Sequence, residues 1–185
     1  MGKIIAIANQ KGGVGKTTTS INLSAGLAYL GQKVLLVDLD PQGNASQGVG
    51  ASNHDFKLST YDLLIHEDSV HDVRIQLQTP PLDIIPATID LAGADLEMNR
   101  FEVGSDQILK NKLDPIKDEY DFVIIDCPPS LGLLNTNALT AADSVIIPVQ
   151  SEYYALEGLT QLLSTIRLVQ KLFNPNLKIE GVLSA

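Results

Sequence analysis

Short runs of Ile, Val and Leu alternate along the chain with segments whose apolar residues have helical spacing. The apolar runs cover residues 3–8, 33–38, 82–86, 122–126, 144–149 and 178–183. Continuous runs of this length are typical of strands that are buried on both faces of a parallel sheet. The helical patterns between them cover residues 17–30, 60–65, 106–116, 133–141 and 156–173. The alternation predicts an α/β fold, a doubly wound and mostly parallel sheet with helices on both faces.

One residue and two segments add detail to the expected fold. Gly31 follows the first helix, where a glycine commonly ends a helix. Residues 43–57 are rich in Gly, Asn, Ser and Gln, which predicts a mobile surface loop. The last apolar run, 178–183, has no helical pattern after it. We therefore expect one domain over residues 1–185, truncated at its C-terminus.

The composition narrows the class of protein. The chain has 185 residues, of which 44% are hydrophobic, so it can bury a core and is not a disordered chain. Acidic residues number 22 and basic residues 13, for a net charge of −9 and no cluster of Lys and Arg. The electrostatic field of a chain with this net negative charge disfavours binding to nucleic acid. One cysteine excludes a disulfide framework. The apolar runs are too short to span a membrane, so we expect a soluble cytoplasmic protein.

The strongest chemical signal is the glycine-rich segment between the first strand and the first helix. Residues 11–18 read KGGVGKTT, a variant of the phosphate-loop pattern GxxxxGK[ST] with Gln10 in place of the first glycine. Glycines let backbone amides approach phosphate oxygens, and the start of a helix favours an anion. Lys16 is expected to reach the β- and γ-phosphates, and the Thr17 hydroxyl to bind Mg²⁺.

Lys11, at the start of the loop, is not needed for a phosphate cradle within one chain. Its side chain either reaches across to the nucleotide of a partner chain or is simply solvated. From this residue alone the two interpretations remain open.

Carboxylates follow two of the predicted strands. Asp38 and Asp40 end the second strand, and they would share a face if the strand continued through them. Asp126 ends the apolar run 122–126, a Walker B pattern. Ligands bind at the carboxyl edge of open parallel sheets, so these acids are expected to support Mg²⁺ and to orient the attacking water. The alternative for Asp38 and Asp40 is a turn that Pro41 favours.

Taken together, these segments resemble the ParA/Soj family of partition ATPases. The family belongs to the deviant-Walker-A class of P-loop NTPases, which includes MinD and the nitrogenase iron protein. The resemblance is carried by the loop that begins at Lys11, by DLDPQGN at 38–44, by DCPPS at 126–130 and by PVQSEYYALEG at 148–158. The resemblance covers essentially the whole chain. It is a resemblance to the short, Soj-like members of the family, which have no N-terminal helix-turn-helix.

The resemblance implies an ATPase that binds ATP and Mg²⁺ and forms a homodimer around the nucleotide. It implies that the dimer binds DNA without sequence preference, that it is cytoplasmic and associated with the nucleoid, and that it needs no membrane. A ParB/Spo0J-type protein would stimulate an otherwise slow hydrolysis. Family chains continue well past residue 185 and carry adenine contacts and much of the DNA-binding surface there, so weak DNA binding is expected of residues 1–185 alone.

The resemblance also implies roles for individual residues. Lys11 would reach the partner's nucleotide, and Asp40 would position the attacking water. Glu152 matches a position near the dimer interface and the ribose. The Mg²⁺ ligation would rest on Thr17, Asp38 and Asp126. The phosphate cradle would consist of Gly12, Gly13, Val14, Gly15, Lys16, Thr17 and Thr18.

Two other functions remain open at this point. A MinD-like ATPase would cycle on the membrane to place the division site, and an amphipathic C-terminal helix would mark it. A nucleotide-gated regulator of replication initiation would bind ATP with little turnover. The segment 40–44, DPQGN, favours the ParA interpretation over the MinD one.

Overall fold

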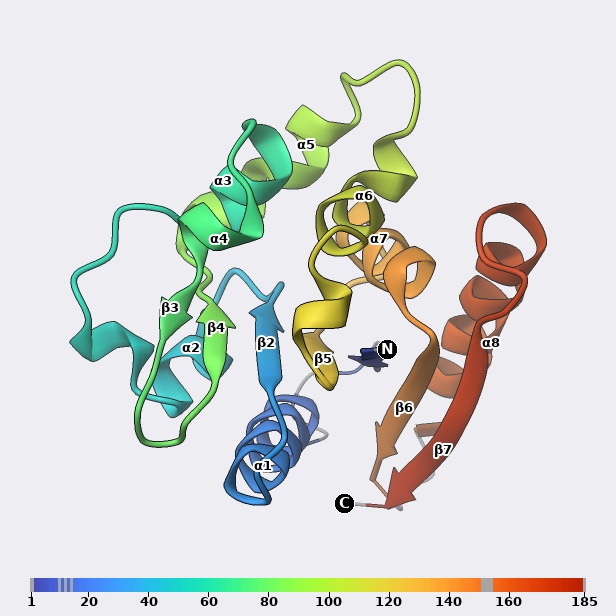
Figure 1. Cartoon of the computed structure of the whole chain (residues 1–185). Coiled ribbons are helices and arrows are strands. Elements are labelled where there is room, and N and C mark those ends of the chain that lie inside the picture. The colour runs from blue at the N-terminus through green and yellow to red at the C-terminus, as the bar shows by residue number, and fades with distance from the viewer. Residues whose placement is uncertain (1, 10, 12, 14, 151–154, 185) are drawn as a thin grey trace.

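A central sheet organises the protein. The computed structural model describes residues 2–9, 11, 13, 15–150 and 155–184, and these residues form seven strands in the order β3-β4-β2-β5-β1-β6-β7 (Figure 1). Every neighbouring pair is parallel except β3 with β4. The strands are β1 (Lys3–Ile7), β2 (Val34–Asp38), β3 (Ile75–Gln76), β4 (Asp83–Ile85), β5 (Phe122–Asp126), β6 (Ser144–Val149) and β7 (Lys178–Ser184).

Helices connect the strands and cover both faces. They are α1 (Lys16–Tyr29), α2 (Asn44–Gly48), α3 (Thr60–Ile65), α4 (Val70–Val73), α5 (Ala94–Met98), α6 (Ile108–Leu113), α7 (Leu133–Ala141) and α8 (Ala155–Leu172). Short 3₁₀ turns lie at Ala51–Asn53, Ile89–Gly93, Ser105–Gln107 and Lys117–Glu119. In Figure 1, α1 lies along the lower side of the sheet, and α5, α6 and α7 lie along the upper side.

Strand alternation divides the interior into two cores. On β1, Ile4 and Ala6 face a core shared with α3 and α5–α8, whereas Ile5 and Ile7 face a smaller core shared with α1 and α2. A sheet buried on both faces requires apolar residues at successive positions, which is the pattern of the sequence. The predicted fold class, a doubly wound and mostly parallel sheet with helices on both faces, is confirmed.

Helix α1 packs against the sheet through small side chains. Ser20, Ser24 and Ala28 are buried at intervals of four residues and lie on one face of the helix. Gly31 follows the helix with φ +87°, and its amide donates to the carbonyl of Ala28 at 3.0 Å. The predicted glycine at the end of this helix is therefore confirmed.

The prediction of a mobile surface loop over residues 43–57 is wrong for residues 44–53, whereas residues 54–57 form no helix or strand. Helix α2 and a 3₁₀ turn occupy this segment, and Ala45, Val49 and Ala51 are at most 4% exposed. They pack in the core shared with α1. Gly48 permits the contact, because a Cβ there would lie 2.3 Å from Cδ1 of Ile21. The segment is polar in composition, but most of its few apolar side chains are buried.

Several short elements were not anticipated: strand β3 and helices α4 and α5. Each has five residues or fewer, which is too short to show a periodicity in sequence. Among the described residues, none of the helices has both the length and the apolar character that crossing a bilayer requires.

Candidate nucleotide site

The carboxyl ends of three adjacent strands bring the predicted acids together. In the sheet register, Asp126 at the end of β5 is opposite Ile7 of β1 on one side and Asp38 of β2 on the other. The glycine-rich loop leaves β1 at this same edge and leads into α1. The topology therefore places the loop and the acids side by side, at the edge where open parallel sheets bind ligands.

The loop has the backbone geometry of a phosphate cradle. Gly13 and Gly15 have φ values of +75° and +81°, a left-handed conformation that favours glycine. Helix α1 begins directly afterwards at Lys16, so its N-terminus faces the cavity formed here. Gly12 and Val14, also predicted for the cradle, lie outside the described residues.

Lys16, Thr17 and Asp126 form the centre of the site. The Thr17 hydroxyl donates to one carboxylate oxygen of Asp126 at 3.1 Å, and the Ser20 hydroxyl donates to the other at 2.8 Å. Burial raises the pKa of Asp126, while the charge of Lys16 and these two hydroxyl groups oppose the rise. Carboxylate and hydroxyl oxygens are the ligands that Mg²⁺ prefers, so the pair Thr17 and Asp126 fits a magnesium ion bound with phosphate.

Asp38 and Asp40 lie at this edge, but β2 does not continue through both. The strand ends at Asp38, whose carboxylate accepts from the amide of Asp40 at 3.0 Å. Ser46 of α2 donates to Asp38 through its amide at 2.9 Å and its hydroxyl at 2.6 Å. Asp38 is completely buried, and burial raises its pKa to about 7. Asp40 is 6% exposed and close enough to raise the pKa of Asp126.

A cavity of about 470 Å³ opens in front of the loop. A volume of this size suits a nucleotide-sized ligand. Sequence reasoning missed Asn44 and Gln150, which come from α2 and from the end of β6. Both follow carboxyl strand ends and lie in the segments 38–44 and 148–158 that carry the family resemblance, but neither signal gives them a role. The lining consists of Gly13, Gly15, Lys16, Thr17, Thr18, Asn44 and Gln150.

Two predicted residues remain to be placed. Lys11 is half-buried, and its backbone amide donates to Oδ1 of Asn9 at 3.0 Å. A single chain does not test whether its side chain reaches a partner, so that role stays a prediction. Glu152 lies outside the described residues.

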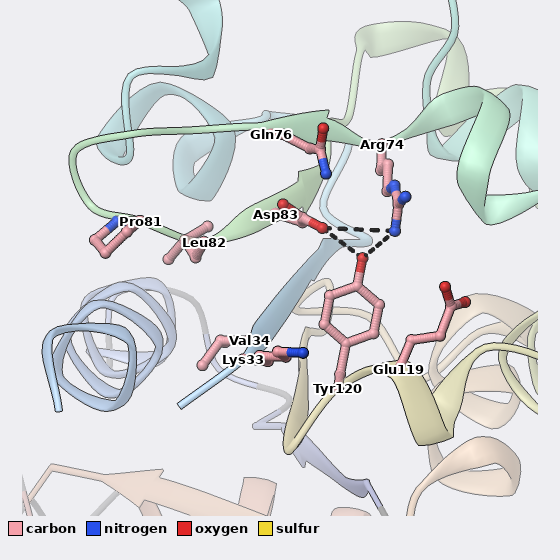
Figure 2. A pocket seen from close by; sticks show the side chains of 9 residues that line it. All are labelled: Lys33, Val34, Arg74, Gln76, Pro81, Leu82, Asp83, Glu119 and Tyr120. Carbon is pink, nitrogen blue, oxygen red and sulfur yellow. Dashed lines mark hydrogen bonds and ion pairs between the residues drawn. The ribbon is translucent and has the colours of Figure 1, made fainter. Parts of the chain in front are cut away.

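A second cavity, of about 400 Å³, lies at the opposite edge of the sheet, where β2 and β4 begin (Figure 2). The Tyr120 hydroxyl donates to Asp83 at 2.5 Å and accepts from Arg74 at 2.8 Å. Arg74 and Asp83 also form an ion pair at 3.6 Å. These polar groups bind one another and join β3, β4 and the chain before β5, which indicates a structural role.

Three features define a P-loop NTPase: a glycine-rich loop between β1 and α1, a lysine at the start of α1, and a threonine bonded to an acid at the end of β5, the strand beside β1 in the sheet. Comparison with known proteins agrees with this class. The AAA domain family (AAA_31) matches residues 2–179.

Two sequence relatives show the family. The chain is 60% identical to the sporulation initiation inhibitor protein Soj of Bacillus subtilis, over 99% of this chain and 72% of Soj. It is 49% identical to the chromosome partitioning protein ParA of Caulobacter vibrioides, over 97% and 68%. The chain belongs to the ParA/Soj family.

A solved structure adds information on ligands. It is the crystal structure of cobyrinic acid a,c-diamide synthase from Mycobacterium smegmatis with bound ATP analog and magnesium. It matches with a TM-score of 0.92 at 42% identity, over 100% of this chain and 75% of that chain. The expected cofactors, ATP and Mg²⁺, match the ATP analog and magnesium bound in this neighbour. The pair of Thr17 and Asp126 offers oxygen ligands that suit the magnesium ion.

Proposed function

We propose that the protein is an ATP-dependent DNA-partitioning ATPase that hydrolyses ATP to ADP and phosphate. The observation that carries the proposal is the hydrogen bond from Thr17 to Asp126, beside Lys16 at the start of α1. It joins the phosphate loop to the end of β5 at the carboxyl edge. The name of the Caulobacter vibrioides relative, chromosome partitioning protein ParA, supports partitioning as the role that this chemistry serves.

The residues of the site have separate tasks in this proposal. The loop amides and Lys16 bind the phosphates, and Thr17 and Asp126 hold the Mg²⁺, which neutralises charge that develops on them. Asp40 holds the attacking water, a role that we assign because it lies at the same carboxyl edge and close enough to Asp126 to raise the pKa of that carboxyl. Asp38 supports the magnesium site from the neighbouring strand end. Its hydrogen bonds with Ser46 also fix the position of α2.

The proposal extends to an assembly. In the ATP state, Lys11 reaches the nucleotide of a second copy, and two sites lie face to face in a homodimer. A charge supplied in trans stabilises phosphoryl transfer in the way an arginine finger does. The full-length family member binds non-specific DNA as this dimer and resides at the nucleoid. A ParB/Spo0J-type protein stimulates its hydrolysis.

Turnover measurements test the catalytic part. We expect slow hydrolysis by the wild-type chain, and in Asp40→Ala we expect at least a tenfold loss, about 1.4 kcal/mol or more, with ATP affinity kept. Asp118→Ala, an exposed acid outside the site, is the matched control. Full activity in Asp40→Ala would show that Asp40 is only a turn residue. Stimulation by a ParB-type protein together with DNA tests the partitioning role.

Sedimentation with ATP tests the assembly. We expect Lys11→Ala to bind ATP as a monomer and neither to dimerise nor to hydrolyse, because Lys16 already serves the phosphates of its own chain. The wild-type chain with ADP provides the reference for the monomer. Normal ATP-dependent dimerisation and turnover in Lys11→Ala would contradict the role in trans.

A further inference from the structure

The end of β6 is tied to the phosphate loop by two side-chain amides. On one side, Asn9 donates from Nδ2 to the carbonyl of Pro148 and accepts the amide of Lys11 at Oδ1, at 3.0 Å. On the other, Gln150 donates from Nε2 to the carbonyl of Gly13 at 2.8 Å. A backbone bond from Ala8 to Ile146, at 3.1 Å, holds β1 and β6 together beneath them.

The two contacts differ in their surroundings. Asn9 is 6% exposed, so its amide is shielded from water and its hydrogen bonds have few competitors. Gln150 is half-exposed and lines the cavity in front of the loop, next to Gly13. The first contact therefore fixes the base of the loop, and the second reaches its middle from inside the site.

Each contact restrains a peptide unit of the loop. The bond from Lys11 to Asn9 spans two residues and forms a local turn that sets the backbone of Lys11. A trans peptide carries its C=O and N–H on opposite sides, so a bond to the Gly13 carbonyl fixes which way that unit faces. Gly13 has φ +75° and nothing within 4 Å of a Cβ position, so its own packing supplies no such restraint.

We propose that Asn9 and Gln150 are positioning residues of the nucleotide site, and that they hold the phosphate loop in its binding shape through the end of β6. The proposal rests on the proposed function for its ligand, but its geometry does not depend on that function. A loop held in shape before the ligand arrives loses less conformational freedom on binding, and its affinity for nucleotide is higher for that reason. Neither residue needs to contact the reacting atoms.

Amide exchange in the free protein tests the geometry without nucleotide. The backbone amide of Lys11 should exchange about 2- to 10-fold faster in Asn9→Ala than in the wild-type protein, the effect of one lost hydrogen bond. Gln32→Ala, an exposed amide beyond α1, is the matched control and should leave this exchange unchanged. Unchanged exchange in Asn9→Ala overturns the proposed restraint at Lys11.

Nucleotide binding and turnover test the consequence. We expect Gln150→Ala to weaken Mg–ATP and Mg–ADP binding about 2- to 10-fold and to raise KM by a similar factor, while kcat changes less than about twofold. Gln150→Glu keeps the shape but cannot donate and adds a charge near the phosphates, so it should weaken binding further. The thermal midpoint of both variants should match that of the Gln32→Ala control.

The outcomes separate the two proposals. Unchanged affinity and KM in both Gln150 variants overturn the positioning role, as does an equal loss of kcat and of kcat/KM without a change in affinity. If the wild-type protein binds neither nucleotide, the proposed function fails and the positioning role for nucleotide fails with it. The exchange measurement would still decide whether Asn9 restrains the loop.

Discussion

Two buried carboxylates stand out at the scale of single residues. Asp38 and Asp126 are completely buried next to each other at the ends of β2 and β5, and both have pKa values raised by burial. Hydrogen bonds from Ser46 and Asp40 offset part of the cost for Asp38. Ionising both carboxylates side by side in a buried place costs free energy, and a magnesium ion bound beside them would offset that cost.

This arrangement predicts how stability depends on pH in the presence of EDTA. The pKa of Asp38 rises from 3.8 to about 7 on folding, so between these values the folded state binds more protons than the unfolded state. The contribution of Asp38 to stability is then complete below about pH 4 and is lost as pH rises through about 7, by on the order of 4 kcal/mol. Urea unfolding at several pH values measures the loss.

Asp38→Asn should flatten that profile, because the amide does not titrate. Asp118→Asn, an exposed acid, should leave the profile as in the wild-type protein. A stability that rises between pH 5 and pH 8 in EDTA, or a profile that Asp38→Asn does not alter, would contradict the account of Asp38.

The sequence predicted the centre of the site but not its surroundings. Lys16, Thr17 and Asp126 could be predicted as site residues because a phosphate loop and a strand that ends in an acidic residue can each be recognised from a few adjacent residues. Ser20 and Gln150 could not, because their partners are more than one hundred positions away, at Asp126 and Gly13. Only the sheet order, with β1 between β5 and β6, brings them together.

At the scale of elements, the network of Figure 2 attaches the short antiparallel strand β3 to the parallel sheet. Tyr120→Phe removes the hydroxyl that joins Arg74 to Asp83. We expect this variant to lose about 1–2 kcal/mol of stability, because two part-buried charged groups each lose a partner. Its affinity for nucleotide should stay unchanged, since the network lies at the opposite edge of the sheet.

Urea unfolding and a nucleotide titration of the same preparation check this prediction. Tyr29→Phe, an exposed tyrosine at the end of α1, is the matched control. A loss of nucleotide affinity in Tyr120→Phe, with stability unchanged, would indicate that the second cavity belongs to the nucleotide site.

The long elements were predicted, as were the short α3 and β4, whereas β3, α2, α4 and α5 were not, for a physical reason. Strands β1, β2 and β5 are continuous apolar runs, and α1 and α8 are long enough for a periodic pattern. Helix α2 has five residues, most of them polar or glycine. Its burial depends on the close packing of Gly48 against the side chain of Ile21 in α1. That contact is tertiary, so no local pattern could reveal it.

At the scale of the whole molecule, the net charge of −9 bears on the proposed DNA binding. DNA affinity depends on Lys and Arg that neutralise phosphates and release counterions. We expect residues 1–185 alone to bind duplex DNA with a dissociation constant weaker than about 10 µM at about 0.15 M salt. A mobility-shift series over salt concentration checks this, and tight binding by this chain would contradict it.

The central claim is that the carboxyl edge of the sheet binds Mg–ATP through the phosphate loop, and one calorimetric titration tests it most directly. Lys16→Ala should weaken binding about 10- to 150-fold, about 1.5–3 kcal/mol, because it removes a charge-assisted contact to phosphate. Lys33→Ala, a lysine in the cavity of the opposite edge, should bind like the wild-type protein. Equal affinity in Lys16→Ala and the wild-type protein would contradict the account.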